Sequence, residues 1–153
     1  MTKAPGKNFL LVTGILYIVF NAFAAMIFPL TMLTINSWLW MFGGEAMRDM
    51  WMLLYTLAIL LSLFAVAVGI MGVAFCNKIH KAGLLLGVVI VCTALSIIFN
   101  LVYTAAILNF SGEMGFLTII GIPFGLVLPI LFIIGAVKNK KAADAAPYER
   151  EWR

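Results

Sequence analysis

Asn77-Lys78-Ile79-His80-Lys81 is the only charged stretch between Asp49 and Glu113 of this 153-residue chain. Long apolar runs lead into this basic turn and away from it. Because the turn is short, the apolar segments on its two sides are expected to be antiparallel neighbours. Its positive charge also indicates which side of a membrane it occupies, and that side determines the side of every other connection.

The composition indicates a membrane protein. Hydrophobic residues make up 65% of the chain and charged residues 10%, and the mean hydropathy is +1.14. Soluble domains are about half apolar and about a quarter charged, so this chain has too few polar residues to cover a water-facing surface. The formal net charge of +4 lies in separate connections without stacked aromatic residues. This pattern favours the lipid bilayer as a partner and argues against nucleic acid.

Four apolar segments, residues 9–33, 50–75, 83–108 and 116–137, are predicted to span the membrane. Each is long enough to cross a hydrocarbon core of about 30 Å. A signal peptide is the alternative for the first, because Lys3 and Lys7 precede it and Ala22-Phe23-Ala24 resembles a cleavage motif. Hydrophobicity continues past that motif to Leu30, which favours a retained span. Residues 142–153 are expected to form a disordered cytosolic tail.

The distribution of charge predicts the topology. Nine of the ten Lys and Arg residues lie before the first span, in the basic turn or in the tail, and the exception is Arg48. The positive-inside rule then places both termini and the turn in the cytoplasm. We therefore expect an all-α protein: a four-helix integral membrane bundle of the cell membrane, in one domain over residues 1–141.

The polar residues inside the spans are uncharged, since no Asp, Glu, Lys, Arg or His falls in any of them. Asn21, Asn100 and Ser96 are predicted to form interhelical polar contacts, because an amide in hydrocarbon requires partners. The alternative is a polar lining for a small-solute site, joined by Thr93 and Thr104. A proton-coupled exporter is disfavoured, because such proteins carry intramembrane charges.

Small residues predict a packing seam between the second and third spans. Ala65 and Gly69 are four residues apart, as are Gly83 and Gly87, so each pair lies on one helix face and lets backbones approach closely. The alternative is a homodimer face.

The first outer connection, residues 34–49, contains Trp38 and Trp40, and Trp51 follows it. An interfacial belt is one interpretation and an outer docking surface is the other. His80 is expected to be a solvated turn residue, and Cys76 and Cys92 to be too far apart for a disulfide. No catalytic, metal-binding or cofactor-binding set is recognised, so the sequence predicts a protein that is not an enzyme.

Two echoes suggest a doubled hairpin: Ile18-Val19-Phe20-Asn21 resembles Ile97-Ile98-Phe99-Asn100, and Ala74-Phe75-Cys76-Asn77-Lys78 resembles Ala136-Val137-Lys138-Asn139-Lys140. Gly69-Ile70-Met71-Gly72, the turn Lys78 to Lys81-Ala82-Gly83 and the ending Gly135 to Lys140 resemble a loose group of small bacterial four-span membrane proteins of unknown function. That resemblance covers the last three spans and implies no catalytic residues. The layout also resembles claudin-like tetraspan proteins, although their paired outer-loop cysteines are missing here.

The sequence predicts two classes of function. The first is an accessory or immunity-type subunit that acts through contacts with lipid, a membrane-protein partner or a second copy of the chain. The alternative is a small oligomeric channel or transporter for a neutral or small solute. Convergence of Asn21, Asn100 and Ser96 on a cavity favours the alternative, whereas pairing among them in a dry core favours the first.

Overall fold

The computed structural model describes residues 4–42, 44–111 and 114–151 of the chain. For residues 35, 38–42, 110, 111, 114–125 and 146–151 it describes the backbone alone. This part of the chain forms four α-helices and one short 3-10 turn. In chain order they are α1 (Lys7–Phe42), α2 (Glu45–Phe75), η1 (Ile79–Lys81), α3 (Ala82–Ser111) and α4 (Met114–Glu151).

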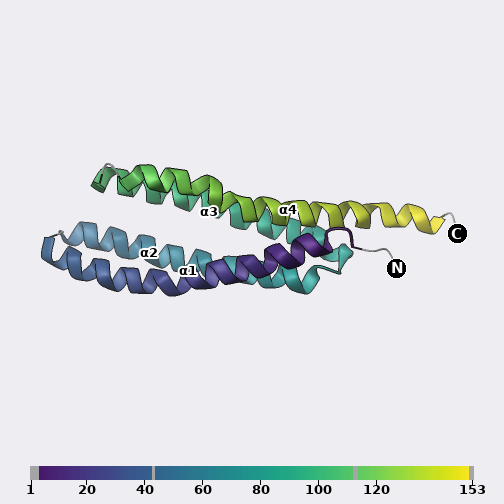
Figure 1. Ribbon diagram of the computed structural model, residues 1–153, viewed down its shortest axis with the longest axis horizontal. Helices are drawn as coiled ribbons and strands as arrows, with labels where there is room; N and C mark the ends of the chain where they lie inside the picture. The colour runs from purple at the N-terminus through teal and green to yellow at the C-terminus, as the bar shows by residue number, and fades with distance from the viewer. Residues whose placement is uncertain (1–3, 43, 112–113, 152–153) are drawn as a thin grey trace.

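Consecutive helices are antiparallel. They form two hairpins, α1–α2 and α3–α4, which η1 joins (Figure 1). Both ends of the chain and η1 lie at the same end of the bundle. Lys7, the turn over residues 77–81 and the lysines of residues 138–141 belong to this basic end. The C-terminal ends of α1 and α3 and the N-terminal ends of α2 and α4 lie at the opposite, distal end.

Three helical segments, Lys7–Thr34, Glu45–Phe75 and Ile79–Asn109, are long and apolar enough to cross a membrane. They contain the first three predicted spans. The fourth predicted span, residues 116–137, lies within α4, but the side chains of residues 116–125 are outside the described part.

Two helices are longer than their predicted spans. The first predicted span ends at Leu33, but α1 continues to Phe42, because the sequence has no glycine or proline between Thr34 and Phe42. Gly44 is the extended N-cap residue of α2, which begins at Glu45. Residues 142–151, predicted to be disordered, continue α4 to Glu151. Alanine has the highest helix propensity, and this stretch is Ala-rich.

At the basic end, α1 meets α4 at two glycines. A Cβ on Gly6 would collide with the carbonyl oxygen of Gly135, and a Cβ on Gly135 would lie 3.2 Å from the Leu10 nitrogen. Close approach of the two backbones therefore requires both glycines. Beside them, the Lys138 ammonium lies 4.5 Å from the centre of the Phe9 ring, a cation–π contact between α4 and α1.

Asn139 holds three helices together at this end. Its side chain is fully buried. The Gly6 N–H donates to Asn139 Oδ1 at 2.7 Å, and Asn139 Nδ2 donates to the Cys76 carbonyl oxygen at 3.0 Å. Helix ends leave such backbone groups without intrahelical partners. The Asn139 side-chain amide thus provides hydrogen-bond partners for a backbone N–H at the start of α1 and for the carbonyl of the C-cap residue of α2. We call this arrangement the Asn139 clamp.

In the described residues, small residues bring α1 and α2 into close contact. A Cβ on Gly69 would lie 2.9 Å from the Gly14 carbonyl oxygen and 3.1 Å from the Ile18 nitrogen. By contrast, Gly83 and Gly87 are exposed, and a Cβ on either would meet no heavy atom within 4 Å. Gly69 therefore serves α1 rather than α3, and Gly83 and Gly87 do not form the seam that the sequence predicts. Ala65, the fourth residue of that prediction, is buried in the core.

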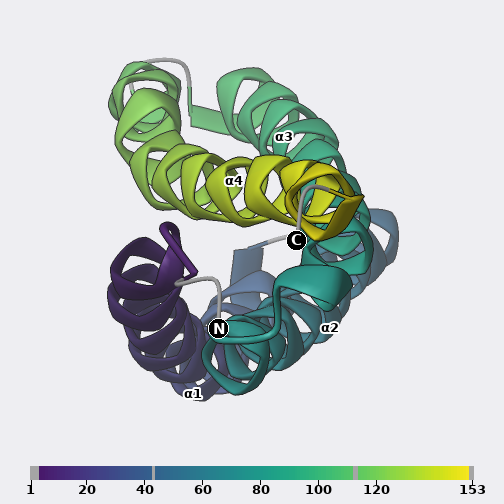
Figure 2. The same cartoon turned by 90° about the vertical axis from the view of Figure 1, so that its right-hand side faces the viewer.

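The first and last helices, α1 and α4, lie close together at the basic end and diverge toward the distal end (Figures 1 and 2). At the basic end, Phe9, Leu10 and Tyr17 of α1 and the preceding Gly6 contact residues of α4 between Phe132 and Asn139.

Asn139→Ala is expected to lower the free energy of unfolding by about 2 kcal/mol or more, because it leaves two buried backbone groups without partners. Denaturant or thermal unfolding in detergent measures the change. Asn77→Ala is the matched control, since Asn77 is exposed in the basic turn and its loss should cost less than about 0.5 kcal/mol. Equal effects of the two substitutions would contradict the clamp.

Gly69→Ala and Gly87→Ala are expected to have opposite effects on stability. The new methyl group at residue 69 meets backbone atoms of α1, so the helices must separate at a cost of about 1–3 kcal/mol. At residue 87 the space is open, and alanine should gain up to about 1 kcal/mol of helix propensity. The same unfolding measurement compares them. Greater destabilisation by Gly87→Ala would place the seam between α2 and α3 instead.

Candidate functional site

A polar cavity of about 190 Å³ lies between α1, α2 and α3. Its polar lining consists of Asn21 from α1, Ser62 from α2, and Ser96 and Asn100 from α3. The apolar part of its wall is formed by Ala24, Phe28, Ala58, Leu61 and Phe99. The cavity thus brings together the three polar residues singled out in the sequence, Asn21, Asn100 and Ser96, and adds Ser62.

The polar side chains of the cavity hydrogen-bond to their own helices. Asn21 Nδ2 donates to the Tyr17 carbonyl oxygen at 2.8 Å, and Asn100 Nδ2 donates to the Ser96 carbonyl oxygen at 2.7 Å. The Ser96 hydroxyl donates to the Cys92 carbonyl oxygen at 2.9 Å. These carbonyls lie four residues back on the same helix, a partner that local geometry always provides. The hydrogen bonds therefore differ from the interhelical contacts that the sequence predicts.

These bonds leave hydrogen-bonding capacity at the cavity. An asparagine amide has two N–H donors and an oxygen acceptor, and the bonds above use one donor of Asn21 and one of Asn100. The Ser96 oxygen keeps its acceptor positions. Ser62 is 7% exposed, and its hydroxyl has no hydrogen bond to any described residue. The site thus offers both donors and acceptors to a molecule in the cavity.

The described lining of the cavity contains no charged or titratable side chain. Uncharged amides and hydroxyls recognise a neutral hydrogen-bonding molecule, whereas a bare ion would lose its hydration without a compensating charge. Phe28 and Phe99 supply flat apolar walls for the non-polar part of such a molecule. In the described residues no group of three or more His, Cys, Asp or Glu is placed to hold a metal ion.

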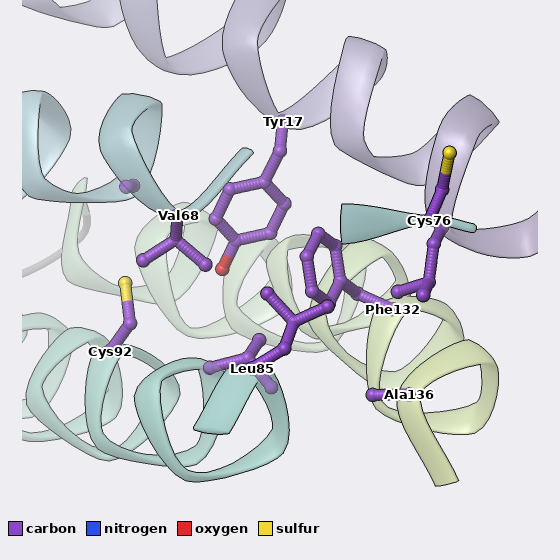
Figure 3. Close-up of a cluster of buried hydrophobic side chains, with 10 residues drawn as sticks. Tyr17, Val68, Cys76, Leu85, Cys92, Phe132 and Ala136 are labelled. Carbon is purple, nitrogen blue, oxygen red and sulfur yellow. The ribbon is translucent and has the colours of Figure 1, made fainter. Parts of the chain in front are cut away.

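Toward the basic end, the cavity is bordered by a buried layer to which all four helices contribute (Figure 3). Its members are Tyr17, Ala65, Cys92 and Phe132, each at most 4% exposed. The Tyr17 and Phe132 rings are 5.8 Å apart between centres and inclined at 55°. Cys76 and Cys92 are both free and buried.

Toward the distal end lies an aromatic cluster that joins α1, α2 and α3. The Trp51 ring centre is 6.2 Å from that of Tyr55 and 6.0 Å from that of Tyr103, the latter pair edge to face. Phe28 and Phe99, which line the cavity, also pack against this cluster. Trp51 is 6% exposed, so it belongs to the interior and not to the outer docking surface that the sequence suggests. The Trp38 and Trp40 side chains lie outside the described residues.

A second hollow is a groove of about 430 Å³ between α2 and α3. Its lining is wholly apolar: Leu54, Leu57, Leu60, Leu61, Phe64, Leu95, Ile98, Phe99 and Val102. Leu57, Leu60, Ile98 and Val102 are more than 40% exposed, so the groove is accessible from outside the bundle.

Reasoning from sequence missed two residues. Ser62 is the one polar member of a small-residue stripe with Ala58, Ala65, Gly69 and Gly72, and spacings of three and four residues place that stripe on one face of α2. Asn139 belongs to the repeated ending Ala136-Val137-Lys138-Asn139-Lys140, but its partners, Gly6 and Cys76, are 133 and 63 residues away. Nothing local in the sequence indicates such contacts.

Comparisons of this chain with protein-family models, with curated proteins and with solved structures found no match. The resemblance to small bacterial four-span membrane proteins therefore stays a prediction.

Proposed function

We propose that the chain is a multi-pass membrane protein of the cell membrane, with its basic end in the cytoplasm. Large apolar side chains are exposed along all four helices, including Met26 at 70% and Leu33 at 68%. Such exposure is costly in water and favourable in hydrocarbon. Nine of the ten Lys and Arg residues lie in segments at the basic end or in the tail beyond it, which supports the cytoplasmic orientation.

In this orientation the polar cavity lies near the middle of the bilayer. Asn21 follows Lys7 by 14 residues and Ser96 follows Lys81 by 15, so both are about 21–23 Å along their helices from the lysines. Half the thickness of a bilayer with its headgroups is also about 20–22 Å. Transporters commonly bind their substrates at this depth.

We infer that the protein binds a small uncharged polar solute in this cavity and conducts it across the membrane. The convergence of Asn21, Ser62, Ser96 and Asn100, with hydrogen-bonding capacity unused, is the observation that carries this inference. Burying polar groups at this depth of the hydrocarbon core costs free energy. Helix cohesion does not account for them, because the hydrogen bonds of Asn21, Ser96 and Asn100 stay within single helices.

The size of the cavity limits the solute. A cavity of about 150 Å³ accommodates benzene, so about 190 Å³ suits a molecule of up to about eight heavy atoms. Small polyols and amides of this size offer donors and acceptors and carry no charge. The cavity lies within one chain, so an oligomer is not required to form the binding site.

The second candidate is the accessory role, in which a transmembrane helix of a partner protein occupies the α2–α3 groove. The observation in its favour is the length of apolar, exposed surface between Leu54 and Phe64 on α2. Helix-in-groove binding uses such surfaces. The polar cavity has no part in this role, so the candidate explains less of the interior.

Permeation of glycerol and urea into liposomes tests the transport proposal. Liposomes containing the protein are expected to swell faster than empty liposomes, with no increase in potassium chloride permeability. The double substitution Asn21→Leu and Asn100→Leu should reduce the protein-dependent rate at least tenfold, because it removes both amides and fills part of the cavity. Stopped-flow light scattering measures the rate, and Asn77→Ala is the control.

Two outcomes would contradict transport: no permeation above empty liposomes, or an unchanged rate in the double variant. The variant must elute as a single species and retain its thermal transition. If permeation is absent while a photo-crosslinker at residue 60 gives one discrete adduct and a crosslinker at residue 130 gives none, the accessory role is favoured. Leu60 lies in the groove, whereas Ile130 is exposed on α4.

Cysteine labelling in intact cells tests the orientation. In a chain carrying Cys76→Ala and Cys92→Ala, Gly44→Cys should react with an impermeant maleimide added outside. Lys81→Cys should react only after the cells are permeabilised. Both positions are exposed, so burial does not explain a difference between them. The reverse pattern would place the basic end outside.

A further inference from the structure

On α1, α2 and α3, the residues of the buried layer lie one helical turn closer to the basic end than the polar residues of the cavity. Tyr17 precedes Asn21 by four residues and Cys92 precedes Ser96 by four, toward the basic end. Ala65 follows Ser62 by three residues in the same direction, because α2 runs the opposite way. Phe132 of α4 completes the layer (Figure 3). A solute leaving the cavity toward the basic end therefore meets Tyr17, Ala65 and Cys92 first, and then Phe132, whose ring lies beside Gly72.

Phe132 is wedged between α1 and α2. Its ring packs against Tyr17 and occupies the space that Gly72 leaves free, since a Cβ on Gly72 would lie 2.5 Å from Phe132 Cε2. Phe132 is fully buried. The Tyr17 hydroxyl points away from this ring and lies beside the side chains of Cys92 and Thr93 on α3. The pair thus spans the bundle from α2 through α4 and α1 to α3.

Below the layer the bundle stays closed as far as the Asn139 clamp. Leu10, Leu85, Val89, Ala136 and Asn139 have no exposed surface. Tyr17 and Gly6 are 11 residues apart, so this closed region is about 16 Å thick. On the distal side the arrangement differs, because α1 and α4 move apart there (Figure 2).

We propose that Tyr17 and Phe132 form the gate that closes the cavity toward the basic end. The structure is then the closed-inward state of the transport cycle, and release of solute requires Phe132 to leave the space beside Gly72. This inference rests on the proposed function, because a gate has meaning only for a solute path. Native Cys92 lies in the gate layer itself and reports whether water reaches it.

The reactivity of Cys92 tests the gate. In a chain carrying Cys76→Ala, which keeps the backbone carbonyl used by Asn139, Cys92 should react very slowly with a water-soluble methanethiosulfonate reagent. Phe132→Ala should increase the rate at least tenfold, because it removes the ring that packs against Tyr17, whose hydroxyl lies beside Cys92. Tyr17→Ala should act in the same direction, whereas Tyr17→Phe keeps the ring and should leave the rate within about twofold. Mass spectrometry of the reconstituted protein follows the modification.

Leu54→Ala is the matched control for general loosening. Leu54 is 6% exposed and lies on the distal side of the cavity, so its truncation should leave the Cys92 rate unchanged. If Phe132→Ala does not elute as a single species, Phe132→Leu replaces it with an expected increase of at least threefold. The gate is wrong if the Phe132 substitution leaves the rate unchanged, if Leu54→Ala raises it equally, or if Cys92 reacts rapidly without any substitution.

The labelling assay tests the gate and the permeation assay tests transport, so each proposal can be contradicted without the other. Labelling needs no solute, so slow reaction of Cys92 that Phe132→Ala accelerates would keep the closed layer even if glycerol and urea do not permeate. In that case the layer is a structural seal and transport is rejected. Permeation with unchanged labelling would keep transport and move the gate elsewhere.

Discussion

The side-chain amide of Asn139 is the constraint on which the arrangement of the helices depends. It accepts a hydrogen bond from the start of α1 and donates one to the end of α2, and it does so from the middle of α4. Few interactions in a bundle of apolar helices have a direction, because hydrocarbon side chains pack against lipid and protein alike. These two hydrogen bonds are directional, so they fix the positions of α1, α2 and α4 relative to one another at the basic end. The Gly6–Gly135 contact sets their separation there.

A bundle fixed at one end and divergent at the other has two different halves. In the half near the clamp, side chains from all four helices fill the interior, and Phe132 occupies the space beside Gly72. In the distal half, the aromatic cluster joins α1, α2 and α3, and α4 moves away from α1. The polar cavity lies at the boundary between these halves. Its position therefore follows from where close packing ends, and not only from the polar residues that line it.

The sequence predicts which segments are helical more fully than how they pack. Apolar length identifies three segments that are long enough to cross a membrane, and charge places the basic turn and the lysines near both termini together. Packing is harder to predict, because the spans are apolar on every face and a contrast between polar and apolar sides does not mark the side that meets a neighbour. Gly69 illustrates the difficulty: its spacing from Ala65 predicts a close contact, but the sequence does not say that the partner is Gly14. Asn21, Asn100 and Ser96 are recognisable as exceptional residues in apolar segments, whereas their convergence on one cavity depends on the packing of three helices.

The sequence echoes between the two hairpins pair Asn21 with Asn100 and Asn77 with Asn139. If the hairpins descend from a duplication, Asn21 and Asn100 are equivalent residues, and Asn77 and Asn139 are the second equivalent pair. The first pair has kept one role, because both asparagines line the cavity and bond to the carbonyl four residues back. The second pair has diverged: Asn139 is buried and joins three helices, whereas Asn77 is exposed in the turn. The clamp ties α4 of the second hairpin to both helices of the first hairpin at the basic end, whereas Asn77 makes no equivalent contact to the described residues. The asymmetry between Asn77 and Asn139 therefore holds the two hairpins together at the basic end, while α1 and α4 diverge toward the distal end.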